Sequence, residues 1–215
     1  MEQSVLLRWQ ETTKQIYQGV LLYTLANLLY SIFDSINSLV SGASNLMSFA
    51  ESGTVDTGIG FLDVICWIFL AGLIYGYYLF LKGLDKFKPM LSVADAEAVG
   101  KIRLAVILAI VAAVVDFIPF LGWVGTIINI VSFIMMMIGY SALKNSPTFP
   151  NKARNGASKL FTAMILMIVA AVFGFIPFIG WVFALVLDII VFFMILSGWA
   201  TIKNSTPDTI ETQQV

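Results

Sequence analysis

Histidine is absent from the 215-residue chain, cysteine occurs once, and charged residues make up only 12% of it. Without histidine the most common general base is missing. A single cysteine gives no disulfide within the chain, and the usual zinc and haem ligand sets cannot form. The charged fraction is about half of the 25% that is typical of soluble domains, which excludes an ordinary soluble fold. These absences predict a protein that is not an enzyme and has no metal site and no cofactor.

Apolar residues fill most of the chain. Hydrophobic residues make up 59% of the sequence and the mean hydropathy is +0.91. This composition excludes a disordered chain and is typical of polytopic membrane proteins. The formal net charge of −1 argues against a nucleic-acid partner, which would require a basic surface. The expected surroundings are the lipid bilayer, and the expected partners are another membrane protein or a second copy of the chain.

Six apolar segments approach the roughly 20 residues that a helix needs to cross the bilayer core. A polar loop at 41–58 and proline or glycine residues in the other connections separate them. The expected helices run over 17–40, 59–81, 103–117, 123–143, 160–175 and 181–202. Ser92 and Asp95 have the spacing of a capping box, so the third helix is expected to begin near Val93. Asn151 is expected to cap the fifth helix in the same way.

The second half of the chain repeats itself at an offset of 58 residues. The segments KIRLAVILAIVAAVVDFIPFLGW at 101–123 and KLFTAMILMIVAAVFGFIPFIGW at 159–181 are identical at 15 of 23 positions. Both copies begin and end on the basic side, so the repeat is parallel. The predicted fold is an all-α integral membrane protein with six transmembrane helices in three helical hairpins. Residues 1–215 then form a single transmembrane domain, with a divergent first hairpin at 1–89, repeat hairpins at 93–150 and 151–208, and a short polar tail at 209–215.

The distribution of charge along the chain predicts its orientation. All 12 basic residues lie in the N-terminus, the second and fourth connections, or the C-terminus, whereas 41–58, 116–122 and 174–180 contain none. The basic side also holds seven acidic residues, and the remaining six acidic residues lie on the other side or within the spans. The positive-inside rule then places both termini in the cytoplasm. We expect a multi-pass protein of the plasma (inner) membrane.

The sharpest motif is Phe-Ile-Pro-Phe-x-Gly-Trp, which occurs at 117–123 and again at 175–181. It predicts a tight turn in which proline takes the first position of the next helix, where no N–H is needed, and glycine permits close backbone approach. The tryptophan suits the aromatic belt of the membrane interface. Partner binding or gating is the alternative role of these turns. The predicted turn and interface anchors are Pro119, Gly122, Trp123, Pro177, Gly180 and Trp181.

Polar residues within the spans are the candidate functional groups, because a charge at the centre of a membrane helix costs about 2.5–3.5 kcal/mol on insertion scales. Asp188 lies seven residues into the sixth segment, and Asn129 lies six residues into the fourth. The offset of 58 pairs Asp188 with Ile130, which predicts two separate positions and not one duplicated site. Each group would either bond to a neighbouring helix or serve an ion, proton or ligand. A candidate acidic rim at the outer side comprises Asp34, Asp63 and Asp116.

Two functions fit these observations. The leading hypothesis is a non-catalytic polytopic membrane protein that acts through protein or lipid contacts within the bilayer, because no connection is long enough to form a domain outside it. The repeated residues are also of turn and anchor types. The alternative is a channel or transporter for a cation or small solute, using Asp188, Asn129 and the acidic outer rim.

Overall fold

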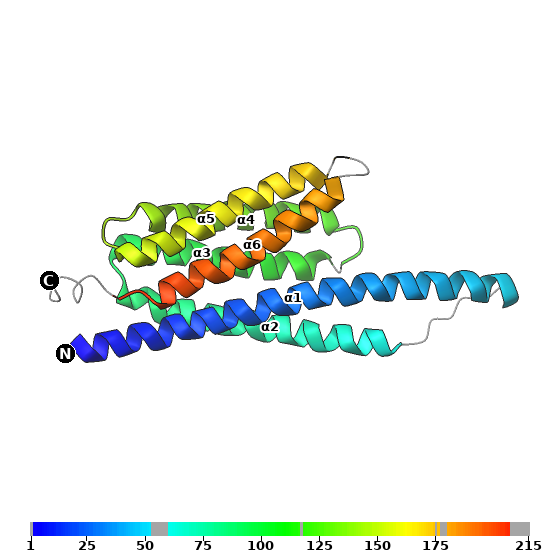
Figure 1. The fold of residues 1–215 in the computed structure, drawn as a ribbon, viewed down its shortest axis with the longest axis horizontal. Helices are drawn as coiled ribbons and strands as arrows, with labels where there is room; N and C mark the ends of the chain where they lie inside the picture. The colour runs from blue at the N-terminus through cyan, green and yellow to red at the C-terminus, as the bar shows by residue number, and fades with distance from the viewer. Residues whose placement is uncertain (1, 53–59, 117, 175, 177–179, 207–215) are drawn as a thin grey trace. The chain divides into compact units, whose positions relative to one another are not determined.

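A computed structural model of the chain describes residues 2–52, 60–116, 118–174, 176 and 180–206. These residues form six α-helices and one short 3₁₀ helix, and no strand occurs among them (Figure 1). Each α-helix contains a stretch that is long and apolar enough to cross a membrane. The prediction of an all-helical protein with six apolar spans is therefore confirmed. The helices are α1 (Glu2–Ser52), α2 (Phe61–Phe87), η1 (Lys88–Met90), α3 (Val93–Asp116), α4 (Gly122–Asn145), α5 (Asn151–Gly174) and α6 (Gly180–Lys203).

The first helix is much longer than predicted. The expected polar loop at 41–58 is wrong for residues 41–52, which continue α1 to Ser52. Serine, glycine and asparagine at 41–45 are weak helix formers, and each costs up to about 1 kcal/mol relative to alanine. No proline interrupts the segment, and the good helix formers Leu46, Met47 and Ala50 follow it. Weak propensity alone does not end a helix that is already propagating.

The starts of α3 and α5 test the two predicted caps. Ser92 caps α3, because its Oγ accepts a hydrogen bond from the Asp95 N–H at 3.2 Å and donates one to Asp95 Oδ2 at 2.8 Å. This prediction is confirmed, and α3 begins at Val93. The expectation that Asn151 caps α5 is wrong, because Asn151 is the first helical residue and the preceding Pro150 carbonyl accepts the first helical bond, from the Arg154 N–H.

The helices belong to two compact units, which are described separately. The first unit comprises residues 1–18 together with 79–215, and the second comprises residues 19–78. In the first unit α3 packs against α4, α4 against α5, and α5 against α6 (Figure 1). Aromatic side chains from three helices meet in its core. The Trp199 ring lies edge-to-face with Phe80 at 5.5 Å and with Tyr140 at 6.3 Å between centroids, an arrangement that aromatic pairs prefer.

A glycine brings α4 close to α3. A Cβ atom added to Gly139 would lie 2.5 Å from Ile102 Cγ1 and 2.9 Å from the Ala98 carbonyl oxygen. Both distances are shorter than real side chains allow, so only glycine permits this approach. Small residues at helix crossings are the usual means of close packing in membrane proteins.

A second glycine brings α6 equally close to α5. A Cβ atom added to Gly198 would lie 2.7 Å from Leu160 Cγ and 3.0 Å from the Gly156 carbonyl oxygen. Gly156 and Leu160 are the counterparts of Ala98 and Ile102 at the offset of 58 residues. The pair α5–α6 thus uses the same positions for its closest approach as the pair α3–α4.

The second unit contains the C-terminal part of α1 and the N-terminal part of α2. A Cβ atom added to Gly76 would lie 2.5 Å from the Tyr23 backbone nitrogen, and one added to Gly72 would lie 3.6 Å from Ala26 Cβ. The Tyr23 and Tyr77 rings stack beside this crossing with centroids 4.8 Å apart. The Gly-x-x-x-Gly pattern of α2 therefore serves a crossing within the chain.

Candidate functional site

Asp188 lies on an exposed part of α6. Its side chain is exposed, and so are the apolar side chains of Ile189, Ile190 and Phe193. Among the residues that the structure describes, Asp188 has no hydrogen-bond or ion-pair partner. Asn129 on α4 is likewise exposed and without a partner in the same described part. Neither group faces the packed interior of the first unit, and the structure does not bring them together in a pocket.

Asp188 and Asn129 nevertheless occupy equivalent places on their helices. Gly139 and Gly198, which make matched contacts with the preceding helix, are 59 residues apart and not 58. Asn129 lies ten residues before Gly139, and Asp188 lies ten residues before Gly198. The two polar residues therefore have the same position along the helix axis, and the same direction around it, relative to the glycine contact. When the two helices are aligned on these glycines, Asp188 aligns with Asn129 and not with Ile130. The reason is that α6 has one more residue between its tryptophan and its glycine than α4 has. In this register an amide on α4 and a carboxyl on α6 occupy matching positions.

Asp63 holds the start of α2 against α1 within the second unit. Its Oδ1 accepts a hydrogen bond from Asn37 Nδ2 at 2.7 Å, and its Oδ2 accepts one from the Gly60 N–H at 2.7 Å. Both oxygens are thus used in a local helix contact, which is a structural role. The side chains of Asp34 and Asp116 lie outside the described residues, so the acidic rim stays a prediction.

A pocket of about 340 Å³ adjoins Asp63. Apart from Asp63, its polar lining is uncharged and consists of asparagine and serine side chains of α1. Among the described residues, no group of three acidic, histidine or cysteine side chains could hold a metal ion. The residues that line this pocket are Asn37, Val40, Ser41, Ser44, Asn45, Gly60, Phe61, Leu62 and Asp63.

The turn between α3 and α4 uses its proline differently from the prediction. Leu121 N–H donates to the Ile118 carbonyl at 3.1 Å, so Pro119 takes the second position of a β-turn and Phe120, at φ 68°, takes the third. This is the type II pattern, which favours proline second and normally glycine third. The helix α4 begins only at Gly122, so the expectation of proline at its first position is wrong.

The other anchors of this turn are only partly described. Space is open around Gly122, where an added Cβ would meet nothing within 4 Å, so glycine is not needed there for close approach. Trp123 is 66% exposed, as an interface residue would be. Gly180 is the first residue of α6. Pro177 and the side chain of Trp181 lie outside the described residues, and their predicted roles stay predictions.

A buried carboxylate that the sequence indicated only as a helix cap organises the basic end of the first unit. Asp95 is 1% exposed, and its Oδ2 accepts hydrogen bonds from Ser92 Oγ and, at 2.7 Å, from Thr148 Oγ1. Its Oδ1 is buried without a hydrogen-bond partner in the described part of the chain. Thr148 belongs to the connection between α4 and α5, so Asp95 joins this connection to the start of α3. No sequence pattern predicts this contact, which joins residues 53 positions apart.

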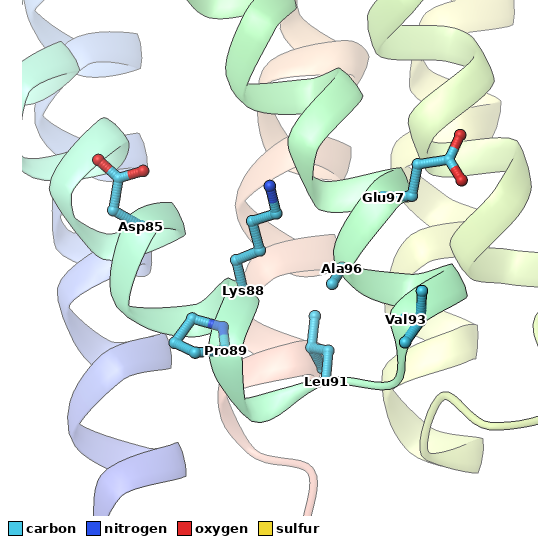
Figure 2. A pocket seen from close by; sticks show the side chains of 7 residues that line it. All are labelled: Asp85, Lys88, Pro89, Leu91, Val93, Ala96 and Glu97. Carbon is cyan, nitrogen blue, oxygen red and sulfur yellow. The ribbon is translucent and has the colours of Figure 1, made fainter.

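Beside this network lies an open pocket of about 570 Å³ between the end of α2 and the start of α3. Figure 2 shows the Lys88 side chain extending from the connection into the space between the two helices. The side chains of Asp85 and Glu97 lie on either side of it, and the Glu97 carboxyl group points away. The remaining lining residues, Pro89, Leu91, Val93 and Ala96, are apolar. Sequence reasoning did not single out Lys88, because it treated the basic residues only as a topology signal.

Two further lysines at this end lie over aromatic rings. Lys144 Nζ lies 3.9 Å from the centre of the Phe161 ring, and Lys203 Nζ lies 4.4 Å from the centre of the Tyr17 ring. Each pair is a cation–π interaction that joins the end of one helix to another. Lys144 and Lys203 are 59 residues apart, so they follow the same register as the packed glycines.

The architecture is that of a multi-pass helical membrane protein, because six of its helices have the length and composition of membrane spans. No protein family model, no curated protein and no solved structure matches this chain.

Proposed function

We propose that this chain is a non-catalytic polytopic membrane protein that acts through contacts within the bilayer, and that a second membrane protein binds it along α6. The observation that carries this proposal is the exposure of Asp188 among the exposed apolar residues Ile189, Ile190 and Phe193. An acidic side chain on the apolar surface of a membrane helix is typical of a functional contact.

The cost of placing a carboxyl group in lipid favours a protein neighbour over lipid at this position. Acyl chains offer no hydrogen-bond donor. The free-energy cost of moving a carboxyl group from water to a position that faces them is therefore not offset by any new hydrogen bond. A polar group of a neighbouring helix can bond to it, which is worth about 0.6–2 kcal/mol within membranes. Asn129 repeats this arrangement on α4, so the same kind of contact is available on a second helix.

The matched glycine contacts support the finer parts of the proposed architecture. They are expected if 93–150 and 151–208 are parallel repeat hairpins that follow a divergent first hairpin. The proposed orientation has both termini in the cytoplasm and the basic ends of the helices on that side. Asp188 would then lie in the outer half of the membrane, about 12 Å from the first residue of α6 at the usual rise per residue.

The channel or transporter hypothesis receives less support from the geometry. It requires polar groups of the spans to line a shared path, but neither Asp188 nor Asn129 lines the two pockets described above. This hypothesis stays open to the flux measurement given below.

The test uses the full chain in native membranes with a photoreactive amino acid in place of Phe193. We expect a discrete adduct with one protein, and we expect Asp188→Ala to reduce its yield about three- to thirtyfold, as the loss of one interhelical bond predicts. Mass spectrometry of the adduct identifies the species that is bound. The matched control is Ile130→Ala, which shortens an exposed apolar side chain at a similar depth on α4 and should leave the yield unchanged.

Two other results would contradict the proposal. Adducts that contain only lipid would show that no protein covers this face of α6. Cation or solute flux in reconstituted vesicles that Asp188→Asn abolishes would instead establish the transport hypothesis.

A further inference from the structure

Lys88 is a cation without a partner at the mouth of a pocket. Among the described residues, its ammonium group makes no hydrogen bond or ion pair, although its backbone carbonyl accepts one from the Leu91 N–H. The two acidic residues that line the pocket already have partners, because Asp85 pairs with Arg103 at 2.5 Å and Glu97 pairs with Lys101 at 3.0 Å. Figure 2 shows the Glu97 carboxyl group pointing away from the Lys88 ammonium and the Asp85 side chain on the opposite side of the pocket. The pocket therefore presents one uncompensated positive charge.

The connection that carries Lys88 is firmly anchored. Phe87, the residue before it, is buried and packs edge-to-face on Trp9 with ring centroids 4.9 Å apart. Pro89 follows in the 3₁₀ helix and has a fixed φ. The base of the lysine side chain is thus held in place, and less conformational entropy is lost when a ligand binds its ammonium group.

Gly100 of α3 leaves room for the ammonium group. A Cβ atom added there would lie 3.6 Å from Lys88 Nζ and 3.9 Å from its Cε. The side chain thus lies along the surface of α3, two turns beyond the start of the helix at Val93. A Cβ at these distances makes ordinary van der Waals contact, so alanine would fit at position 100, whereas the longer side chain of leucine would compete with the lysine for this space.

The rim of the pocket is apolar and exposed. Val93 is 89% exposed, and Pro89 is exposed beside it. The pocket also lies at the ends of two candidate spans, α2 and α3, where a bilayer would place its headgroups. Such a site complements an amphiphile with a negative headgroup. The headgroup can bind the ammonium group, and the apolar part can contact the apolar rim.

We propose that this pocket binds the phosphate group of an anionic phospholipid in the leaflet at the basic end of the helices. The Lys88 ammonium donates hydrogen bonds to the phosphate oxygens, while Val93 and Pro89 contact the glycerol region and the first acyl carbons. The site is separate from the face of α6 that carries Asp188, so this proposal does not depend on the proposed protein contact.

The experiment measures lipid retention by the purified full-length protein with native mass spectrometry. The probe is phosphatidylglycerol, with phosphatidylcholine as the zwitterionic comparison, and inorganic phosphate is added as a competitor. We expect one phosphatidylglycerol to be retained in preference to phosphatidylcholine, and Lys88→Gln to weaken this retention about fivefold, as the loss of one basic contact predicts. Inorganic phosphate should compete weakly, because it lacks the apolar part.

Two variants separate this site from a general effect of charge. Lys152→Gln removes one charge from an exposed lysine at the start of α5, outside the pocket, and should leave retention unchanged. Gly100→Leu keeps every charge but fills the space beside Lys88 Nζ, and should weaken retention as Lys88→Gln does. Equal losses from Lys88→Gln and Lys152→Gln would overturn the proposal, and so would equal retention of the two lipids. Full displacement by inorganic phosphate would assign the site to a free anion.

Discussion

Single side chains at the basic end of the first unit connect segments that are far apart in the sequence. Asp95 is buried, so each hydrogen bond to its carboxyl group offsets part of the cost of removing that group from water. The Ser92 contact is local and follows from the capping-box spacing, which is why the sequence predicts it. The Thr148 contact spans 53 residues and depends on how α4 and α5 are joined, so local spacing does not reveal it.

Thr148→Val should destabilise the protein by about 1–3 kcal/mol, because it removes a hydrogen bond to a buried charged group while keeping the shape of the side chain. The measurement is thermal or chemical unfolding in detergent micelles. Thr148→Ser keeps the hydroxyl group and should restore most of the stability. Thr162→Val is the control for threonine itself, because Thr162 is exposed and bonds only to the Ser158 carbonyl of its own helix. Equal effects at positions 148 and 162 would refute the role given to Asp95.

The direction in which Asp188 points was also beyond sequence reasoning. A helix that is apolar on all sides shows no periodic pattern, and α6 is such a helix. The sequence therefore identifies Asp188 as unusual without showing whether it faces the interior or the exterior. Tertiary packing, including that of Gly198 on α5, sets the rotation of α6 and hence the exposure of Asp188.

At the level of helices, the predicted boundaries hold where a strong breaker is present. Proline or a proline–glycine pair separates α3 from α4 and α4 from α5. The observed ends of α3 and α4 lie within a few residues of the expected ones once the cap at Ser92 is included, whereas α5 begins nine residues before the expected start at 160. The boundary of α1 was wrong because serine, glycine and asparagine weaken a helix without blocking it. The residues against which the glycines pack come from other helices, so the sequence around each glycine does not identify them.

Gly139→Ala tests the closest helix approach. The added methyl group would lie 2.9 Å from the Ala98 carbonyl oxygen, which belongs to the backbone and cannot move aside. We expect a loss of about 1–3 kcal/mol of stability, typical of overpacking, in the same unfolding measurement. Gly122→Ala is the matched control, because an added Cβ meets nothing within 4 Å there. A loss at Gly122 as large as that at Gly139 would show that backbone freedom, and not close packing, requires these glycines.

At the scale of the whole molecule, the separation of charge is the property that the sequence reveals most directly. It requires only the order of basic residues along the chain and the positions of six spans. The division of the described residues into two compact units was not predicted, since apolar spans resemble one another in composition whatever they pack against. A bilayer strongly favours one side of the membrane for basic residues, so their order along the chain is informative. Lipid tails are as apolar as the side chains of the spans, so apolar composition does not indicate which helices pack together.

The orientation can be tested by labelling introduced cysteines with a membrane-impermeant maleimide. Ser52→Cys should react in intact cells, because the end of α1 is expected outside, and Lys152→Cys should react only after the membrane is permeabilised. The native Cys66 is buried, so it should contribute little background. Protection at position 52 together with labelling at position 152 in intact cells would invert the proposed topology.

The length of α1 has a consequence of its own. Its 51 residues extend about 75 Å at the rise of an α-helix, whereas the hydrocarbon core measures about 30 Å. No tilt within the usual range of about 0–40° can immerse the whole helix. Past Asn37, which bonds to Asp63 of α2, the helix continues for 15 residues, or about 22 Å. The helical backbone therefore sets the distance between Asn37 and Ser52, which an ordinary loop of the same length would leave variable.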